Sequence, residues 1–207
     1  MPRSVVCISH SSGAGGEEIG RLVADRLGFR YVDEELISRA AERGGFDPET
    51  AADAERRKTI FAGLLDYLRE DRADPASPTS SPASGEPPSE AVRSFIRDAI
   101  HEVAEQGNAV IVAHAASYAV GGGRDVLRVL VTAPSQIRAK RLAAESGLGE
   151  LEAERTISRS DAGRADYVKR FYGVLQEVPT DYDLVVNTDT VGLERASALI
   201  VQAATDQ

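Results

Sequence analysis

A glycine-rich turn near the N-terminus holds the first residues that could do chemistry. Residues 4–9 are apolar and β-branched, which predicts a buried strand, and the sequence SSGAGGEE follows directly. Gly13, Gly15 and Gly16 allow a sharp turn and a close approach to a ligand, and the amides at a helix start attract anions. This pattern predicts a phosphate-binding loop made of Ser11, Ser12, Gly13, Ala14, Gly15, Gly16 and Glu17. The alternative is a tight glycine turn that binds no ligand.

The turn departs from the P-loop pattern G-x-x-x-x-G-K-[ST]. In that pattern the lysine grips the β- and γ-phosphates and the hydroxyl holds Mg²⁺. Here Gly16 stands at the lysine position and Glu17 at the Ser/Thr position. Glu17 could hold Mg²⁺, since carboxylates are good magnesium ligands. It could equally be one of the acids that are common in a first helical turn.

Alternating strand and helix patterns surround this turn. Further strands are predicted over 29–32, 108–113, 126–132 and 183–187. After a first helix that ends at Gly28, helices are predicted over 34–44, 48–70, 90–106, 134–146, 150–172 and 191–204. The alternation predicts an α/β fold in which helices cover both faces of a parallel sheet. Ligands of such sheets bind beyond the carboxyl ends of the strands, which is where the glycine-rich turn falls.

Composition narrows the class of protein. The 207 residues carry a net charge of −9 and show no basic stripe, so we expect no nucleic-acid partner. No apolar run approaches the roughly 20 residues that cross a bilayer, so we expect no membrane span. Cys7 is the only cysteine, which excludes an intrachain disulfide and favours a reducing cytoplasm. Residues 73–90 are rich in Pro, Ser and Ala, which predicts a mobile insertion within a single domain.

Three segments carry a family resemblance. SHSSGAGGEEIGRLVADRLGFRYVDEELI, DAGRADYVKRFYG and YDLVVNTD together resemble the cytidylate kinase-like family, a branch of the P-loop nucleoside-monophosphate kinases. That branch typically has S-R-x-x-G-S-G-G-x-x-I-G at the first turn, so it shares the glycine in place of lysine. The resemblance implies a core of five parallel strands, an NMP-binding region over about 33–105 and a short arginine-bearing lid within about 150–172. It also implies transfer of the γ-phosphoryl group of ATP, with Mg²⁺, to a pyrimidine monophosphate such as CMP or dCMP.

The resemblance assigns roles to individual residues. Arg159 and Arg164 match the lid arginines, with Asp161 as their orienting partner, and lid arginines stabilise transferring phosphoryl groups. The alternative for these residues is a solvated, salt-bridged helix face. Asp33 falls where the family has an acid near the monophosphate site, although it could instead cap a helix that starts at Glu34.

Two positions depart from the family. His10 and His114 stand where the branch usually has arginines, at positions that the resemblance assigns to substrate binding. A guanidinium is always charged and can donate two hydrogen bonds to one phosphate, whereas histidine is largely neutral at pH 7. If the family's arginines bind phosphate, replacing each one by histidine weakens the phosphate site by about 1–3 kcal/mol. We expect no metal site at these histidines. Arg138 and Arg141 could lie near the base or the lid, or on a solvated helix face.

These departures leave the activity open. The leading reading is a kinase that binds nucleotides. The rival is a catalytically silent nucleotide-binding or regulatory protein whose loop has lost its lysine. A third reading is an interaction module in which residues 73–90 do the work, and the sequence leaves the oligomeric state open.

Overall fold

The first apolar run forms the central strand of a parallel five-stranded sheet. Strand β1 (Val5–His10) lies between β3 (Ala109–Val112) and β4 (Val126–Thr132). The outer strands are β2 (Arg30–Asp33), beside β3, and β5 (Leu184–Asn187), beside β4. All four pairings are parallel, as the strand and helix alternation predicted. The fold class expected from the sequence is therefore confirmed.

The computed structural model describes residues 3–33, 37, 90–113 and 115–206. The helices predicted over 34–44 and 48–70 lie outside the described residues, apart from Ile37. The insertion predicted over 73–90 also lies outside them, apart from Glu90, and so does His114. The chain that is described still includes the complete glycine-rich turn and the whole of the predicted lid.

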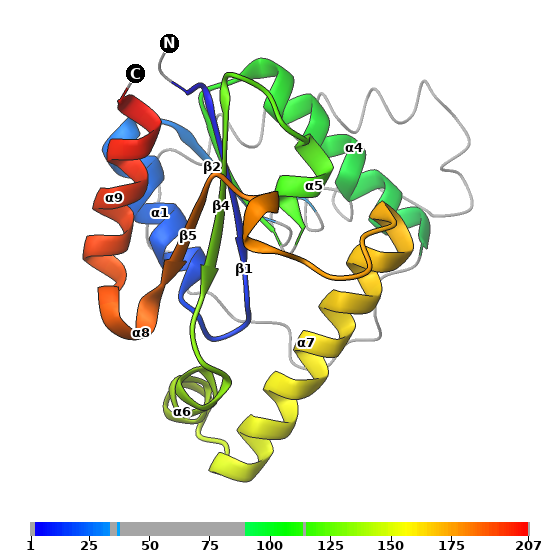
Figure 1. The fold of residues 1–207 in the computed structure, drawn as a ribbon, viewed down its shortest axis with the longest axis vertical. Coiled ribbons are helices and arrows are strands. Elements are labelled where there is room, and N and C mark those ends of the chain that lie inside the picture. Colours follow the sequence, from blue (N-terminus) through cyan, green and yellow to red (C-terminus); the bar gives the residue numbers. More distant parts are fainter. Residues whose placement is uncertain (1–2, 34–36, 38–89, 114, 207) are drawn as a thin grey trace.

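Helices cover both faces of the sheet, as Figure 1 shows for α1 (Gly16–Leu27) and α9 (Leu193–Thr205) on one side and α4 (Glu90–Gln106) and α5 (Ala116–Val120) on the other. The side chains of β1 alternate between two buried clusters, because successive residues of a strand point to opposite faces. Val5 and Cys7 pack in the cluster with α4 and α5, whereas Val6 and Ile8 pack in the cluster with α1 and α9. β1 is thus buried on both sides, and its end is held in a fixed place.

Two further helices lie beyond the carboxyl ends of the strands. Helix α6 (Ser135–Ser146) follows β4, and α7 (Glu150–Tyr172) runs past it along the edge of the molecule in Figure 1. They share a small buried cluster of their own, formed by Ala139, Ala153 and Ile157. This cluster is separate from the two that flank the sheet. The bounds of α7 and α4 agree with the helices predicted over 150–172 and 90–106.

Two of the differences from the predicted bounds lie at residues with positive φ. Gly192 has a φ of 70°, and it separates α8 (Thr188–Val191) from α9, where one helix over 191–204 was predicted. Asn108 has a φ of 50° and forms part of the turn that precedes β3, so this strand begins one residue later than predicted. Among the described residues, none of the helices combines the length and the apolar character that a membrane crossing requires.

Candidate functional site

The glycine-rich turn joins β1 to α1 in a conformation that requires glycine. Gly13 and Gly15 have φ values of 74° and 80°, in the left-handed region that side chains disfavour. A Cβ on Gly13 would lie 2.8 Å from the carbonyl oxygen of Arg138, and one on Gly15 would lie 2.5 Å from Cδ2 of Leu193. The two glycines therefore serve both the backbone shape and the close approach of α6 and α9.

The loop leaves backbone amides available at the start of α1. The Ala14 amide donates to the Ser11 carbonyl at 3.0 Å, and Gly15, the N-cap residue, has no side-chain cap. Within the described residues, the amides of Gly13, Gly15 and Gly16 have no hydrogen-bond acceptor. Glu17, in the first turn of α1, is exposed. Three amides next to a helix N-terminus form an arrangement that suits an anion.

Two serines tie the loop to neighbouring elements. Ser12 Oγ lies 2.6 Å from Ser160 Oγ on α7, and Ser11 Oγ lies 3.4 Å from Thr132 Oγ1 at the end of β4. The first of these contacts brings the predicted lid helix directly to the predicted phosphate loop. The lid and the loop, which are about 150 residues apart in sequence, therefore meet in the structure.

Asp161 pairs with a different arginine from those expected. Its carboxylate accepts from Arg138 Nη1 at 2.9 Å and from Arg138 Nη2 at 2.7 Å. Arg138 is 5% exposed and also donates to the carbonyls of Ala133 and Ser12, at 2.9 and 3.2 Å. The solvated helix face considered for Arg138 is therefore wrong, because α6 packs this side chain between α7 and the loop. Neither Arg159 nor Arg164 takes the place of Arg138 beside Asp161.

Arg164 is buried and held by the protein. Its Nε and Nη2 donate to the two carboxylate oxygens of Glu177, at 2.7 and 2.6 Å, and its Nη1 donates to the His10 carbonyl at 2.8 Å. Burial works against the charged guanidinium, but the hydrogen bonds and charge of Glu177 prevail and raise the pKa of Arg164. Tyr182 donates to Glu177 as well, and burial followed by this hydrogen bond raises the pKa of Tyr182 to about 12. Arg164 thus joins α7 to the end of β1.

Arg159 lies one turn earlier on α7 and is exposed. Its Nε donates to the Arg155 carbonyl within the same helix, at 3.4 Å. The next residue, Ser160, is the one that reaches the loop. Arg159 therefore directly precedes the residue that contacts the loop. Of the two arginines of the predicted lid, Arg159 is the exposed one.

Asp33 lies at the carboxyl end of β2 and is 8% exposed. Arg21 Nη2 lies 3.8 Å from its carboxylate, and the Arg21 guanidinium also lies over the ring of Tyr31, 5.0 Å from the centroid. Burial, and then the charge of Asp33, raise the pKa of Tyr31. Asp33 and His10 both end strands of the sheet, so they share the edge at which ligands of parallel sheets bind.

Aromatic contacts fix the second half of α7. The rings of Tyr118 and Tyr172 lie 5.8 Å apart, and those of Tyr118 and Tyr182 lie 6.1 Å apart. Tyr118 donates to Asp181 at 2.8 Å, and burial is the main cause that raises the pKa of Tyr118. The Val178 amide, followed by Tyr118, lowers the pKa of Asp181 by hydrogen bonding. The contacts join α5 to the end of α7 and to the turn that leads into β5.

Several contacts at this site are visible only in the folded chain. Arg141 Nη1 donates to Oγ1 of Thr188 at 2.9 Å, and Thr188 Oγ1 lies 2.9 Å from the Ala14 carbonyl. Arg141 is partly buried, so the solvated face considered for it is also wrong. The position of Arg138 and Arg141 after β4 had already marked them as candidates near the base or the lid. Thr188 and Glu177 stand in no pattern, because only the folded chain brings them to the loop and to Arg164.

The residues around the loop can be tested against a magnesium ion. In the described part of the chain, no group of three or more His, Cys, Asp or Glu side chains is arranged to hold a metal. Mg²⁺ in phosphoryl-transfer sites is usually held by substrate phosphates, water and one or two carboxylates, so a cage of side chains is not required. The exposed carboxylate of Glu17, beside the loop amides, fits this kind of shared site.

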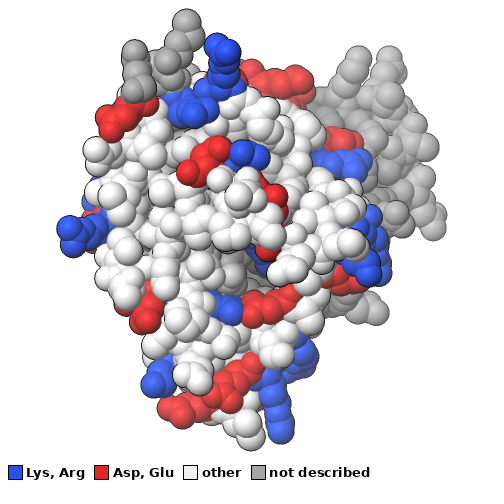
Figure 2. Space-filling model, in the orientation of Figure 1, with Lys and Arg blue, Asp and Glu red and all other residues white. Residues whose placement is uncertain are grey.

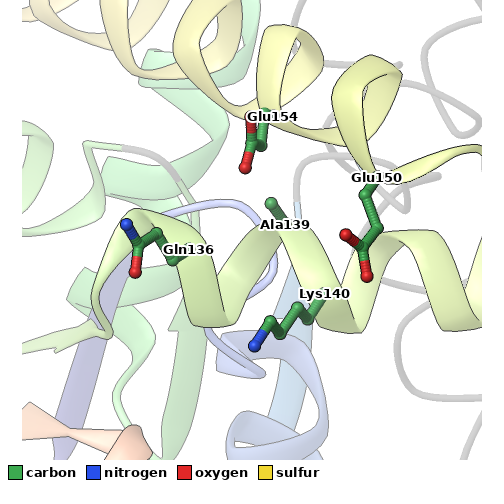
Figure 3. Close-up of a pocket in the computed structure, with 5 residues that line it drawn as sticks. All are labelled: Gln136, Ala139, Lys140, Glu150 and Glu154. Carbon is green, nitrogen blue, oxygen red and sulfur yellow. The ribbon is translucent and has the colours of Figure 1, made fainter.

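A depression lies between α6 and α7 (Figure 3). It is lined by Gln136, Ala139, Lys140, Glu150 and Glu154. Two carboxylates and one lysine do not suit a phosphate. On the face shown in Figure 2, lysines and arginines are interspersed with acidic residues, and no continuous basic stripe is visible.

Comparison with known proteins agrees with this geometry. Residues 5–190 match the model of the Cytidylate kinase-like family. A cytidylate kinase of Ignicoccus hospitalis is 28% identical over 192 residues, which cover 92% of this chain and 93% of that protein. A cytidylate kinase of Pyrococcus horikoshii is 27% identical over 210 residues, which cover 100% and 91%.

Solved structures show the same fold at low sequence identity. An uncharacterized protein from Eubacterium ventriosum has a TM-score of 0.64 at 14% identity, with 99% of this chain and 100% of that chain covered. A gluconokinase from Sinorhizobium meliloti has a TM-score of 0.53 at 14% identity, with 99% and 94% covered. Since the family match spans most of the sequence, the chain belongs to the cytidylate kinase-like family.

Proposed function

We propose that this protein is a nucleoside-monophosphate kinase that transfers the γ-phosphoryl group of ATP to a pyrimidine monophosphate, CMP or dCMP. The family match and the kinase folds among the structural neighbours support nucleotide binding and phosphoryl transfer. The curated relatives that carry the name cytidylate kinase support a cytosine-bearing acceptor.

The observation that carries this proposal is the set of loop amides. Gly13, Gly15 and Gly16 present amides that have no acceptor among the described residues, at the N-terminus of a 12-residue helix. A donor phosphate bound there would accept from these amides and gain from the helix dipole. The hydroxyls of Ser11 and Ser12 belong to the same loop and complete the proposed donor site.

We assign the remaining residues as follows. The exposed Arg159 would contact the transferring group, while Arg164 and Asp161 would hold α7 against β1 and α6. Residues 33–105 would hold the acceptor, with Asp33 and His10 at the strand ends nearest to it. The resemblance assigns His114, which lies outside the described residues, to the same substrate. The acceptor phosphate oxygen attacks the γ-phosphorus, the bond to the bridging oxygen breaks, and ADP leaves. Arginine charge placed at this group stabilises the transition state.

Glu17 would hold Mg²⁺ together with the donor phosphates. When bound, this ion neutralises part of the phosphate charge that develops during transfer. Glu17 itself keeps its carboxylate at the solvent-facing start of α1, where it favours the helix dipole. A Glu17→Gln variant should therefore keep the fold and weaken binding of Mg·ATP more than binding of ATP without the metal.

The experiment combines calorimetric titration with an ADP-release assay. ATP, CMP, dCMP and AMP are titrated separately, and turnover is then measured with each acceptor in the presence of Mg²⁺. We expect turnover with CMP or dCMP that falls about 100-fold or more in Arg159→Ala, the order found when one transition-state donor is removed. Arg155→Ala, an exposed arginine one turn away on α7, is the matched control and should change turnover less than twofold. Absence of binding by all four nucleotides at millimolar concentration would refute the proposal.

One observation favours the second candidate, a catalytically silent nucleotide-binding protein. The Arg164 guanidinium donates to Glu177, His10 and Tyr182, so most of its donors are already occupied by the protein. Gly16 also brings no cation to the loop. ATP binding without ADP release for any acceptor would select this candidate over the kinase.

A further inference from the structure

We propose that Arg138, Arg141 and Thr188 form a carbonyl belt that turns the loop amides toward the donor phosphate. The belt consists of these three side chains and the three successive loop carbonyls that they bind. This inference rests on the proposed nucleotide site, and it names the positioning residues of that site. The belt residues lie on α6 and α8, outside the segment that the sequence pattern marks as the loop.

Each of the three loop carbonyls accepts a hydrogen bond from a different side chain, and we call the side of the loop that they face its outer side. Arg138 Nη1 donates to Ser12 at 3.2 Å, and Arg141 Nη1 donates to Gly13 at 3.4 Å. Thr188 Oγ1 donates to Ala14 at 2.9 Å. Thr188 and Arg138 are 1% and 5% exposed, so these contacts are built into the interior.

The geometry of the peptide bond converts this pattern into an orientation of the amides. The described chain contains no cis peptide bond, and in a planar trans peptide the carbonyl and the following amide point in opposite directions. The carbonyls of Ser12, Gly13 and Ala14 face the belt, so the amides of Gly13, Ala14 and Gly15 face away from it. The Ala14 amide is used by the Ser11 carbonyl. The amides of Gly13 and Gly15 are left for a ligand.

The belt also brings positive charge to a loop that lacks the lysine. Arg138 is neutralised by Asp161, its bidentate partner. Arg141 has no carboxylate within 4.0 Å in the part of the chain that is described, and its Nη1 and Nη2 bind the side chain and carbonyl of Thr188, each at 2.9 Å. One uncompensated guanidinium therefore lies against the outer side of the loop, where it favours an anion on the inner side.

The close approach of α6 makes the belt possible. A Cβ on Gly13 would lie 2.8 Å from the Arg138 carbonyl oxygen and 3.1 Å from Arg138 Cβ. Glycine at this position lets the α6 backbone come near enough for both arginines to reach the loop. The belt and the glycine pattern are two parts of one arrangement.

The test separates orientation of the loop from general stability. Thr188→Val keeps the shape of the side chain and removes the donor to Ala14, whereas Thr188→Ser keeps the hydroxyl. Arg141→Gln removes the charge on a partly buried side chain, and Arg141→Lys keeps it. Lys140→Gln is the matched control, because Lys140 is exposed on the same helix and lines the depression in Figure 3. Binding of ATP, of inorganic pyrophosphate and of CMP is measured by calorimetry, and stability by urea unfolding.

We expect Thr188→Val and Arg141→Gln each to weaken ATP and pyrophosphate binding about tenfold, which corresponds to one hydrogen bond or charge contact. CMP affinity should change less than twofold. Thr188→Ser and Lys140→Gln should bind ATP with an affinity within twofold of that of the parent protein. The ATP affinity of Arg141→Lys should lie between those of the parent protein and Arg141→Gln.

Two results would overturn the belt. Unchanged ATP affinity in both Thr188→Val and Arg141→Gln is one. Loss of ATP and CMP affinity in equal proportion to lost stability is the other, because it would mark these residues as purely structural. If the parent protein binds ATP and pyrophosphate but does not release ADP, the kinase proposal fails and the belt stands. If it binds neither probe, both proposals fail.

Discussion

The imidazole ring of His10 packs directly against Gly16. A Cβ on Gly16 would lie 2.3 Å from Cγ of His10 and 2.4 Å from its Cβ, both far inside van der Waals contact. His10 stands where the family resemblance leads us to expect arginine, and Gly16 stands at the lysine position of a P-loop, so these two positions are neighbours in space. The ring fills the space that a side chain at position 16 would need.

Gly16→Ala should therefore destabilise the protein through this contact, by about 1–3 kcal/mol, as overpacking of a buried site does. His10→Gly made in the same chain should recover part of that loss, because it removes both His10 atoms nearest the new Cβ. Urea unfolding of the parent, the two single variants and the double variant measures the coupling. Additivity within about 0.5 kcal/mol would contradict the contact with His10 as the cause of the loss.

Asp161→Asn should destabilise the protein by about 2 kcal/mol. The change leaves the Arg138 charge buried without its partner, and the 42% exposure of the Asp161 side chain reduces the penalty below that of a fully buried pair. Asp166→Asn is the matched control, since Asp166 pairs with Arg170 on the same helix and both side chains are more than 60% exposed. Equal losses of unfolding free energy in the two variants would contradict the structural role of Asp161.

Glu177→Gln should lower the free energy of unfolding more, by about 3 kcal/mol, because Arg164 is only 7% exposed and, among the described residues, donates to no other carboxylate. The loss should appear both in urea unfolding and as faster amide exchange in the second half of α7, which Arg164 joins to the end of β1. Glu152→Gln, an exposed acid on α7, should change neither measurement. An intact α7 exchange pattern in Glu177→Gln would argue that the aromatic contacts of Tyr118 hold this region alone.

Stability should fall in acid through Asp183. Arg128 donates to the carboxylate from Nε and Nη2, at 3.2 and 2.9 Å, and these hydrogen bonds lower the pKa of Asp183 below its usual 3.8. Because the folded-state pKa is the lower one, the contribution is complete above the unfolded value of 3.8 and disappears as the pH falls through the folded value.

Asp183→Asn removes that contribution. Unfolding free energies measured between pH 7 and pH 2 should show a loss of about 1 kcal/mol at neutral pH that shrinks toward zero in acid. The Arg128 amide also donates to Asp183 at 2.9 Å, and the Oδ1 of Asn can still accept this hydrogen bond, so the link between β4 and β5 is kept. A loss that stays constant over the whole pH range would exclude the charge of Asp183 as its cause.

The strands, α4 and α7 could be predicted from the sequence because their apolar patterns are local. Val5, Cys7 and Ile8 form a run that only a doubly covered strand can bury. The glycine-rich turn was also visible, since positive φ at Gly13 and Gly15 is a local demand. Short elements such as α5 and α8 were not predicted, because four or five residues are too few to show the hydrophobic period of a helix.

Partnerships across the site could not be predicted in the same way. Asp161 was expected to orient the lid arginines at short helical spacing, yet it binds Arg138, 23 residues earlier in the sequence. The reason is tertiary: α6 passes directly over Gly13 and brings Arg138 between the loop and α7. Thr188 is bound to Ala14 across 174 residues, a contact that no sequence spacing encodes.

The separate cluster of Ala139, Ala153 and Ile157 has a consequence for nucleotide exchange. Since α6 and the first half of α7 share this cluster with one another and not with the sheet, they can tilt as one hinged piece while both faces of the sheet remain packed. The cost of tilting is then the loss of a few polar contacts, made by Ser160, Arg138 and Arg141. Spent nucleotide could depart and fresh nucleotide enter on the timescale of a hinge motion, without any loosening of the central strands.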